Sequence, residues 1–189
     1  MCPFSPRAQG NYSSSPPGGG VCMKKVLLGI AVVVLIVTVF SAAPNLDEDL
    51  CAKGETVVFS YKMKDSKVLS VLVGKNDSYL VYRFGTRNKI ETEYPAKKNG
   101  SWNNFVLVSV LYASAGGYSL YFTDGGLKYQ IYDNEGRFGR AVGGSITNIS
   151  TKNVTYFDET YQGIKGRLED LKKYKNMRVV DEDDWNGQI

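Results

Sequence analysis

The segment 118–132 constrains the fold of this chain more than any other, because it has the pattern of a β-hairpin. Apolar side chains alternate with polar or small ones around Asp124-Gly125-Gly126: Tyr118, Leu120 and Phe122 precede the turn, and Leu127, Tyr129 and Ile131 follow it. The glycines can adopt the positive φ angles that tight hairpin turns require. The segment therefore predicts two antiparallel strands that share one apolar face.

Other short segments rich in Val, Ile, Tyr and Phe flank this hairpin and are bounded by Gly, Asn, Asp or Lys. Besides the hairpin, they predict strands over residues 55–63, 67–73, 79–84, 89–94, 105–112, 145–149 and 153–157. Residues 166–175 place Leu168 and Leu171 on one face and predict a short helix. The fold class is thus mainly β, a small antiparallel barrel or sandwich of about eight strands with one short C-terminal helix.

Composition divides the chain into five parts. Residues 1–22 are rich in Pro, Gly and Ser and predict a disordered extension upstream of the true start. Residues 23–43 form an export segment, 44–53 a polar linker and 54–160 the β domain, and residues 161–189 hold the short helix and an acidic tail. Of 189 residues, 43% are hydrophobic and 22% are charged, which is the balance of one globular domain.

The export segment leaves two alternatives open. Met23-Lys24-Lys25 is a positive start, Val26–Phe40 is an apolar run, and Ser41-Ala42-Ala43 supplies the small residues that a signal peptidase accepts. The run is short for a spanning helix, which favours a cleaved signal peptide, although a single-span inner-membrane anchor over 26–43 fits too. Either way, the sequence predicts an exported domain, periplasmic or extracellular.

Charge and residue usage argue against several classes of function. Three of the 23 basic residues lie in residues 1–43, which hold no acidic residue, so residues 44–189 carry 20 basic against 19 acidic residues. This near-neutral balance gives no support for nucleic-acid binding. Histidine is absent, which removes the commonest general base and the commonest metal ligand. We therefore predict no metal and no cofactor.

Residues 79–95, which begin Tyr-Leu-Val-Tyr-Arg-Phe-Gly, carry a resemblance to a known family. With a later Gly-Gly-Leu-Lys-Tyr-Gln-Ile-Tyr-Asp stretch ending at Asp133, the segment resembles an uncharacterised family of small exported proteins of Gram-negative bacteria (the YLxYRFG motif). The resemblance covers roughly residues 51–149 and implies export and a β fold but no activity. The family suggests a disulfide, with Cys51 as its first cysteine, but Leu72 stands where the second would be.

An Arg-Phe-Gly tripeptide occurs twice, at Arg83 and at Arg137, each beside a Tyr-rich strand. Arginines near aromatic rings suit carboxylate, phosphate or sugar-acid ligands. The candidate ligand-binding residues are therefore Tyr82, Arg83, Tyr132, Arg137 and Arg140. The alternative is structural: the arginine of a strand end stacks on an aromatic ring or pairs with Glu91 or Glu93 across the hairpin.

No catalytic set emerges from these residues. We predict a non-catalytic binding or inhibitory module of the cell envelope, whose partner is an unknown protein or envelope ligand and which meets the membrane only through its N-terminal segment. One alternative is a secreted enzyme that uses carboxylates or Tyr on cell-wall or sugar substrates. Another is a structural envelope protein.

Overall fold

The fold is described by a computed structural model, which covers residues 49–157 and 162–189. These residues belong to one compact unit, Asn45–Ile189. Within the described ranges, no helix is long and apolar enough to cross a membrane. The extension 1–22, the export segment 23–43 and the first part of the linker 44–53 lie outside the described residues.

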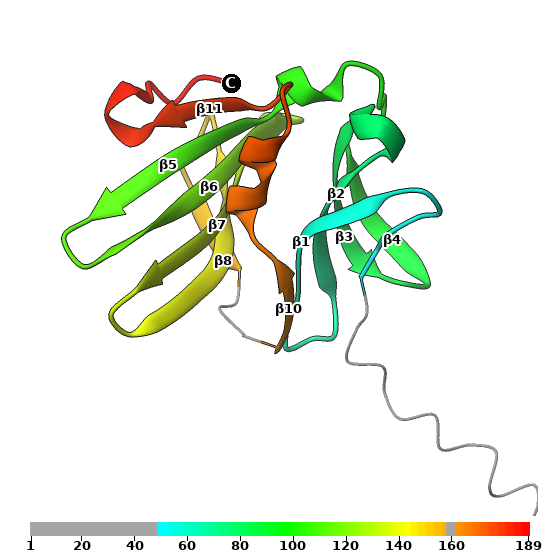
Figure 1. The fold of residues 1–189 in the computed structure, drawn as a ribbon, viewed down its shortest axis with the longest axis horizontal. Helices are drawn as coiled ribbons and strands as arrows, with labels where there is room; N and C mark the ends of the chain where they lie inside the picture. The colour runs from blue at the N-terminus through cyan, green and yellow to red at the C-terminus, as the bar shows by residue number, and fades with distance from the viewer. Residues whose placement is uncertain (1–48, 158–161) are drawn as a thin grey trace, which may run out of the picture. The chain divides into compact units, whose positions relative to one another are not determined.

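One sheet has five antiparallel strands in the order β10-β1-β2-β3-β4 (Figure 1). Its strands are β1 (Thr56–Lys62), β2 (Val68–Val73), β3 (Leu80–Thr86), β4 (Lys89–Tyr94) and β10 (Gln162–Gly166). Every residue of β2 is buried, because core side chains cover one face and the segment around Leu50 covers part of the other. Leu50 is itself buried, and its N–H donates to the Ser70 hydroxyl at 3.1 Å.

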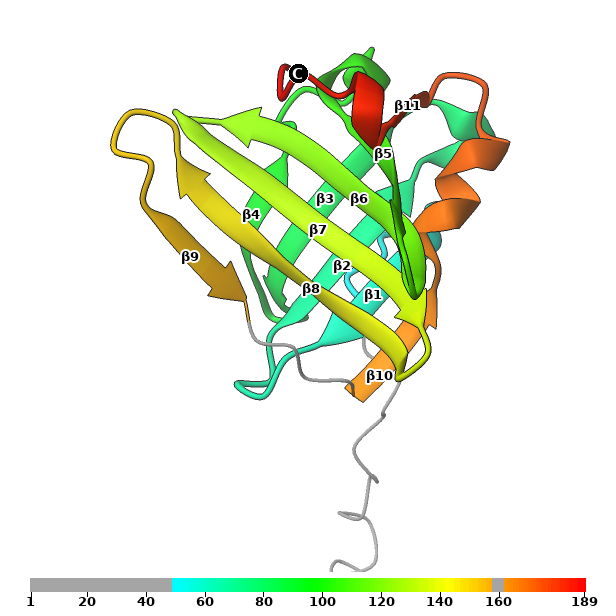
Figure 2. The same cartoon turned by 90° about the vertical axis from the view of Figure 1, so that its left-hand side faces the viewer.

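The second sheet has six strands in the order β11-β5-β6-β7-β8-β9, and Figure 2 shows it from its outer side. Its strands are β5 (Val106–Tyr112), β6 (Ala115–Asp124), β7 (Leu127–Gly136), β8 (Gly139–Asn148), β9 (Val154–Phe157) and β11 (Arg178–Asp181). Strands β5 to β9 pair antiparallel in chain order, whereas β11 joins β5 in parallel. Four short 3₁₀ helices complete the described elements: η1 (Lys75–Asp77), η2 (Ser101–Asn104), η3 (Leu168–Lys173) and η4 (Glu182–Asp184).

The two sheets face each other across one apolar core whose centre is an aromatic cluster around Phe122. The Phe122 ring stacks between Tyr94 of the five-stranded sheet and Tyr129 of its own sheet, with ring centroids 4.7 and 4.6 Å apart. Tyr82 and Phe105 contact the same ring at 4.9 and 5.4 Å. Because these rings come from both sheets, the cluster fixes the sheets face to face.

A polar clasp also links the sheets at one edge. Asp133 of β7 accepts hydrogen bonds from Arg140 Nε at 2.6 Å and Arg140 Nη2 at 2.9 Å, and from the Leu168 N–H at 3.0 Å. Arg140 Nη2 also donates to the Gly166 carbonyl at 2.6 Å. The clasp therefore holds β10 and η3 against β7 and β8.

The mainly β prediction is confirmed, and the hairpin 118–132 is present as β6 and β7 around Gly125-Gly126. The finer expectations differ. The described residues form eleven strands rather than about eight, and two of them, β10 and β11, come from the C-terminal part, for which the sequence predicts only a short helix and an acidic tail. The segment expected to be an α-helix is the 3₁₀ helix η3, which follows the positive-φ residue Gly166 and ends at Lys173.

We expect Phe122→Ala to lower the free energy of unfolding by about 3–5 kcal/mol, because it removes a fully buried ring from between the two sheets. Phe138→Ala is the matched control: Phe138 is 96% exposed in the β7–β8 turn, so its loss should change stability by less than about 0.5 kcal/mol. Urea denaturation measures both. Equal losses in the two variants would contradict the assignment of the core.

Candidate functional site

Rows of side chains cross the outer face of the six-stranded sheet, and each row takes one residue from each of β6, β7 and β8, with β9 adding a residue to two of the rows. Successive residues of a strand point to opposite faces of a sheet. Leu120, Phe122, Ile131 and Val142 lie in the core, so the residues next to them in the chain lie on the outer face. The register from β6 to β9 therefore gives three outward rows: Thr123, Lys128, Thr147 and Val154; Tyr121, Gln130, Ser145 and Tyr156; and Ser119, Tyr132 and Gly143. Hydroxyl and amide groups predominate in these rows.

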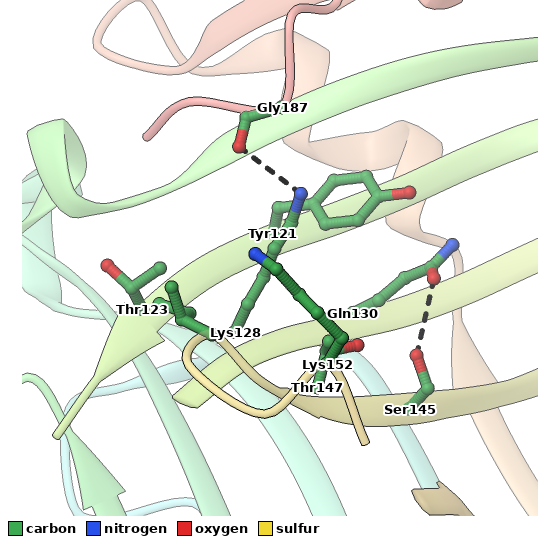
Figure 3. Close-up of a pocket in the computed structure, with 9 residues that line it drawn as sticks. Tyr121, Thr123, Lys128, Gln130, Ser145, Thr147, Lys152 and Gly187 are labelled. Atoms are coloured by element: carbon green, nitrogen blue, oxygen red, sulfur yellow. Dashed lines mark hydrogen bonds between the residues drawn. The ribbon is translucent and has the colours of Figure 1, made fainter. Parts of the chain in front are cut away.

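The described residues form a pocket of about 420 Å³ over the first two rows. Its lining comes from β6, β7, β8, the β8–β9 loop and the C-terminal segment: Tyr121, Thr123, Lys128, Gln130, Ser145, Thr147, Ile149, Lys152 and Gly187. Figure 3 shows these side chains around the pocket, with Lys128 reaching toward Gly187. The volume lies in the range of small-molecule sites.

The lining is positively charged. It includes two lysines, and none of its residues is a carboxylate. Burial lowers the pKa of the Lys128 ammonium group, because the charged form has lost part of its hydration. An anion placed in the pocket would compensate for this lost hydration.

The C-terminal segment closes one side of the pocket. The Trp185 ring lies 5.3 Å from the Tyr121 ring, and Lys128 Nζ lies 5.0 Å from Tyr121 and 5.3 Å from Trp185. Lys128 also donates to the Gly187 carbonyl at 3.2 Å. Two aromatic rings and a carbonyl therefore hold the ammonium group in place.

Hydrogen bonds also orient the polar groups beside Lys128. The Gln130 amide nitrogen donates to the Ser119 hydroxyl at 3.2 Å. The Ser145 hydroxyl donates to the Gln130 amide oxygen at 3.4 Å, as Figure 3 shows. Because the Gln130 amide and the Ser145 hydroxyl both line the pocket and keep further hydrogen-bonding capacity, they can both donate to and accept from a ligand.

The structure places the predicted residues Tyr82 and Arg83 on the other sheet, away from this pocket. Tyr82 is buried in the core, next to Phe122. Arg83 is buried too: it forms a two-point ion pair with Glu55, and its Nε donates to Glu93 across the β3–β4 hairpin at 2.6 Å. Arg83 therefore forms the ion pair with Glu93 that the structural alternative predicted.

The Arg83 cluster also determines the ionisation of Glu55. Burial by itself would raise the pKa of this carboxyl group, but hydrogen bonds from Arg83, the Ala52 N–H and Tyr79 outweigh it and lower the pKa from 4.5 to about 2. The Arg83 guanidinium also donates to the Leu50 carbonyl at 2.9 Å. The cluster thus fastens the segment before β1 to the outer face of the five-stranded sheet.

Three further predicted residues lie on the six-stranded sheet but do not converge. Arg140 is held in the clasp with Asp133, and Arg137 is exposed in the β7–β8 turn. Tyr132 lies on the outer face, where its ring packs over Gly143; a Cβ at Gly143 would come within 2.4 Å of the Tyr132 hydroxyl. Only Tyr132 therefore shares a face with the pocket.

The sequence predictions missed the pocket residues themselves. The pattern carried a partial signal for them, because Lys128 and Gln130 alternate with the apolar residues of the predicted hairpin. No local pattern pointed to Trp185 or Gly187. Cys51, the cysteine that the sequence resemblance implied for a disulfide, is a free thiol whose Sγ donates to the Glu55 carbonyl at 3.2 Å.

Comparison with known proteins adds no relative to this picture. No family model matches the chain, and neither the curated proteins nor the solved structures give a match.

We expect the stability contributed by Glu55 to be complete above pH 4.5 and to be lost as the pH falls toward 2. The pKa of Glu55 is lower in the folded chain than its ordinary value, so the unfolded chain takes up the proton first on acidification. Glu55→Gln should be less stable at pH 6, and its stability should depend less on pH between 4.5 and 2.

Urea denaturation at several pH values measures this difference, with Glu91→Gln as the control. Glu91 is an exposed carboxylate on β4 that pairs with Lys67. Parallel pH curves for the natural protein and Glu55→Gln would show that the ion pair with Arg83 does not bear on stability.

Proposed function

We propose that this chain is an exported, non-catalytic binding module of the cell envelope that holds an anionic ligand in the pocket beside Lys128. The observation that carries the proposal is the lining: two lysines, hydroxyl groups and an amide converge from several elements, and none of the lining residues is a carboxylate. A small anion with several hydroxyl groups matches these donors and acceptors. We therefore expect the ligand to be a component of the cell envelope that carries a negative charge and several hydroxyl groups.

Lys128 supports the proposal most directly. Its ammonium group is partly removed from water, which lowers its pKa, and among the described residues its hydrogen-bond partner is a neutral carbonyl. An ammonium group has three N–H donors, so donors remain for a ligand. A ligand carboxylate or sulfate there would form a charge-assisted bond.

The enzyme alternative finds less support. Among the residues that the structure describes, Glu55 is the carboxylate whose pKa is strongly shifted. Its side chain lies beneath the segment before β1 and is only 1% exposed. Arg83, Tyr79 and the Ala52 N–H already hydrogen-bond to it. Such a satisfied, covered ion pair suits a structural role rather than acid–base chemistry.

The architecture is consistent with this use. Two sheets over one core are best taken as a sandwich, and a sandwich leaves the outer face of each sheet available for contacts. Export rests on the apolar run Val26–Phe40 and the small residues after it. The partner would then meet the module outside the cytoplasm.

We expect Lys128→Met to weaken binding of D-galacturonate, a small hydroxylated carboxylate, about tenfold or more, because a charge-assisted hydrogen bond is worth about 1.5–3 kcal/mol. Trp185 lies beside Lys128, so its fluorescence provides the titration signal. Lys152→Met tests the second lysine of the lining.

Lys173→Met is the control, since this lysine pairs with Asp170 on η3 and does not line the pocket. Urea denaturation of each variant checks that it folds. Binding of neutral D-galactose as tightly as D-galacturonate, or unchanged binding in both lysine variants, would refute the proposed site.

A further inference from the structure

The outer face of the six-stranded sheet continues beyond the pocket as a platform of hydroxyl, amide and tyrosine side chains. In the middle row, Tyr121, Gln130, Ser145 and Tyr156 lie side by side on β6, β7, β8 and β9. At the usual spacing of neighbouring strands, this row is roughly 14 Å long. Tyr156 is 77% exposed at its far end.

The two ends of the row differ. At the β6 end, Trp185 packs on Tyr121, and the adjoining valines of β5 are covered by Val180, Trp185 and Ile189. At the other end, β9 is the last strand of the sheet in the part of the chain that the structure describes, and its Tyr156 is exposed. Across the strands, a ligand anchored at Lys128 can therefore extend toward β9 and not toward β5.

A sugar chain has the chemistry that this row offers. Each sugar hydroxyl both donates and accepts hydrogen bonds, as do the side chains of Gln130 and Ser145. The C–H face of a sugar ring is apolar and flat, and the exposed ring of Tyr156 presents an apolar face with a polar edge. Lys128 and Lys152 add a requirement for negative charge.

We infer that the pocket is one end of an extended site for an acidic oligosaccharide, with an acidic sugar at Lys128 and a later sugar ring against Tyr156. This inference rests on the proposed function, because it takes the pocket to be the anion site. It adds a chain-length preference and a second contact that a single sugar cannot reach.

The test compares galacturonate with trigalacturonate by isothermal titration calorimetry on the natural protein, Tyr156→Ala and Tyr112→Ala. Tyr112 is the matched control, a tyrosine 54% exposed at the end of β5. We expect the trimer to bind more tightly than the monomer. Tyr156→Ala should reduce trimer affinity about fivefold to tenfold, as for one lost aromatic contact, and should leave monomer affinity unchanged.

The possible results distinguish failure of the extended site from failure of the pocket itself. Equal affinity for monomer and trimer, or a trimer affinity insensitive to Tyr156→Ala, would overturn the extended site and leave the proposed pocket standing. Failure of both carboxylated sugars and of a sulfated heparin fragment to bind would overturn both. A polyglutamate peptide that binds as tightly as the trimer, independently of Tyr156, would identify an acidic peptide as the ligand and overturn the saccharide inference.

Discussion

The burial of Phe122 between Tyr94 and Tyr129 is the interaction on which the rest of the structure depends. It joins the two sheets, and it also fixes which face of β6 is turned outward. A slip of one residue in a strand would exchange the two faces, so placing Phe122 in the core places Tyr121 and Thr123 on the surface. The aromatic core and the polar pocket are thus two consequences of one register.

The buried ion pairs serve the fold rather than a ligand. Arg83 binds Glu55 and Glu93 and fastens the segment before β1, while Asp133 joins Arg140 to the backbone at Leu168. Breaking such a buried pair leaves one charge uncompensated, which is why they act as fixed points of the fold. The pocket differs, because Lys128 is held by rings and a carbonyl instead of a carboxylate.

The parts of the fold that local pattern determines could be predicted from the sequence. The hairpin around Gly125-Gly126 depends on neighbouring strands and was predicted, and the pairing of Arg83 with Glu93 was among the structural alternatives to a ligand-binding Arg83. Strand β11 could not be predicted, because it pairs in parallel with β5 although residues 113–177 separate the two strands in the chain. Strand β10 is a short segment with glycines at 163 and 166, which weakens the strand pattern.

The pocket could not be predicted from the sequence for the same reason, because it depends on contacts between residues far apart in the chain. Lys128 and Gln130 lie on the polar face of the predicted hairpin, but such a face forms a pocket only where another segment of the chain covers part of it. Trp185 and Gly187 provide that closure, and β11 brings them to this face from the far end of the chain. The C-terminal segment covers the β6 end of this face, whereas Tyr156 on β9 is exposed among the described residues, and this asymmetry favours a ligand longer than the pocket itself.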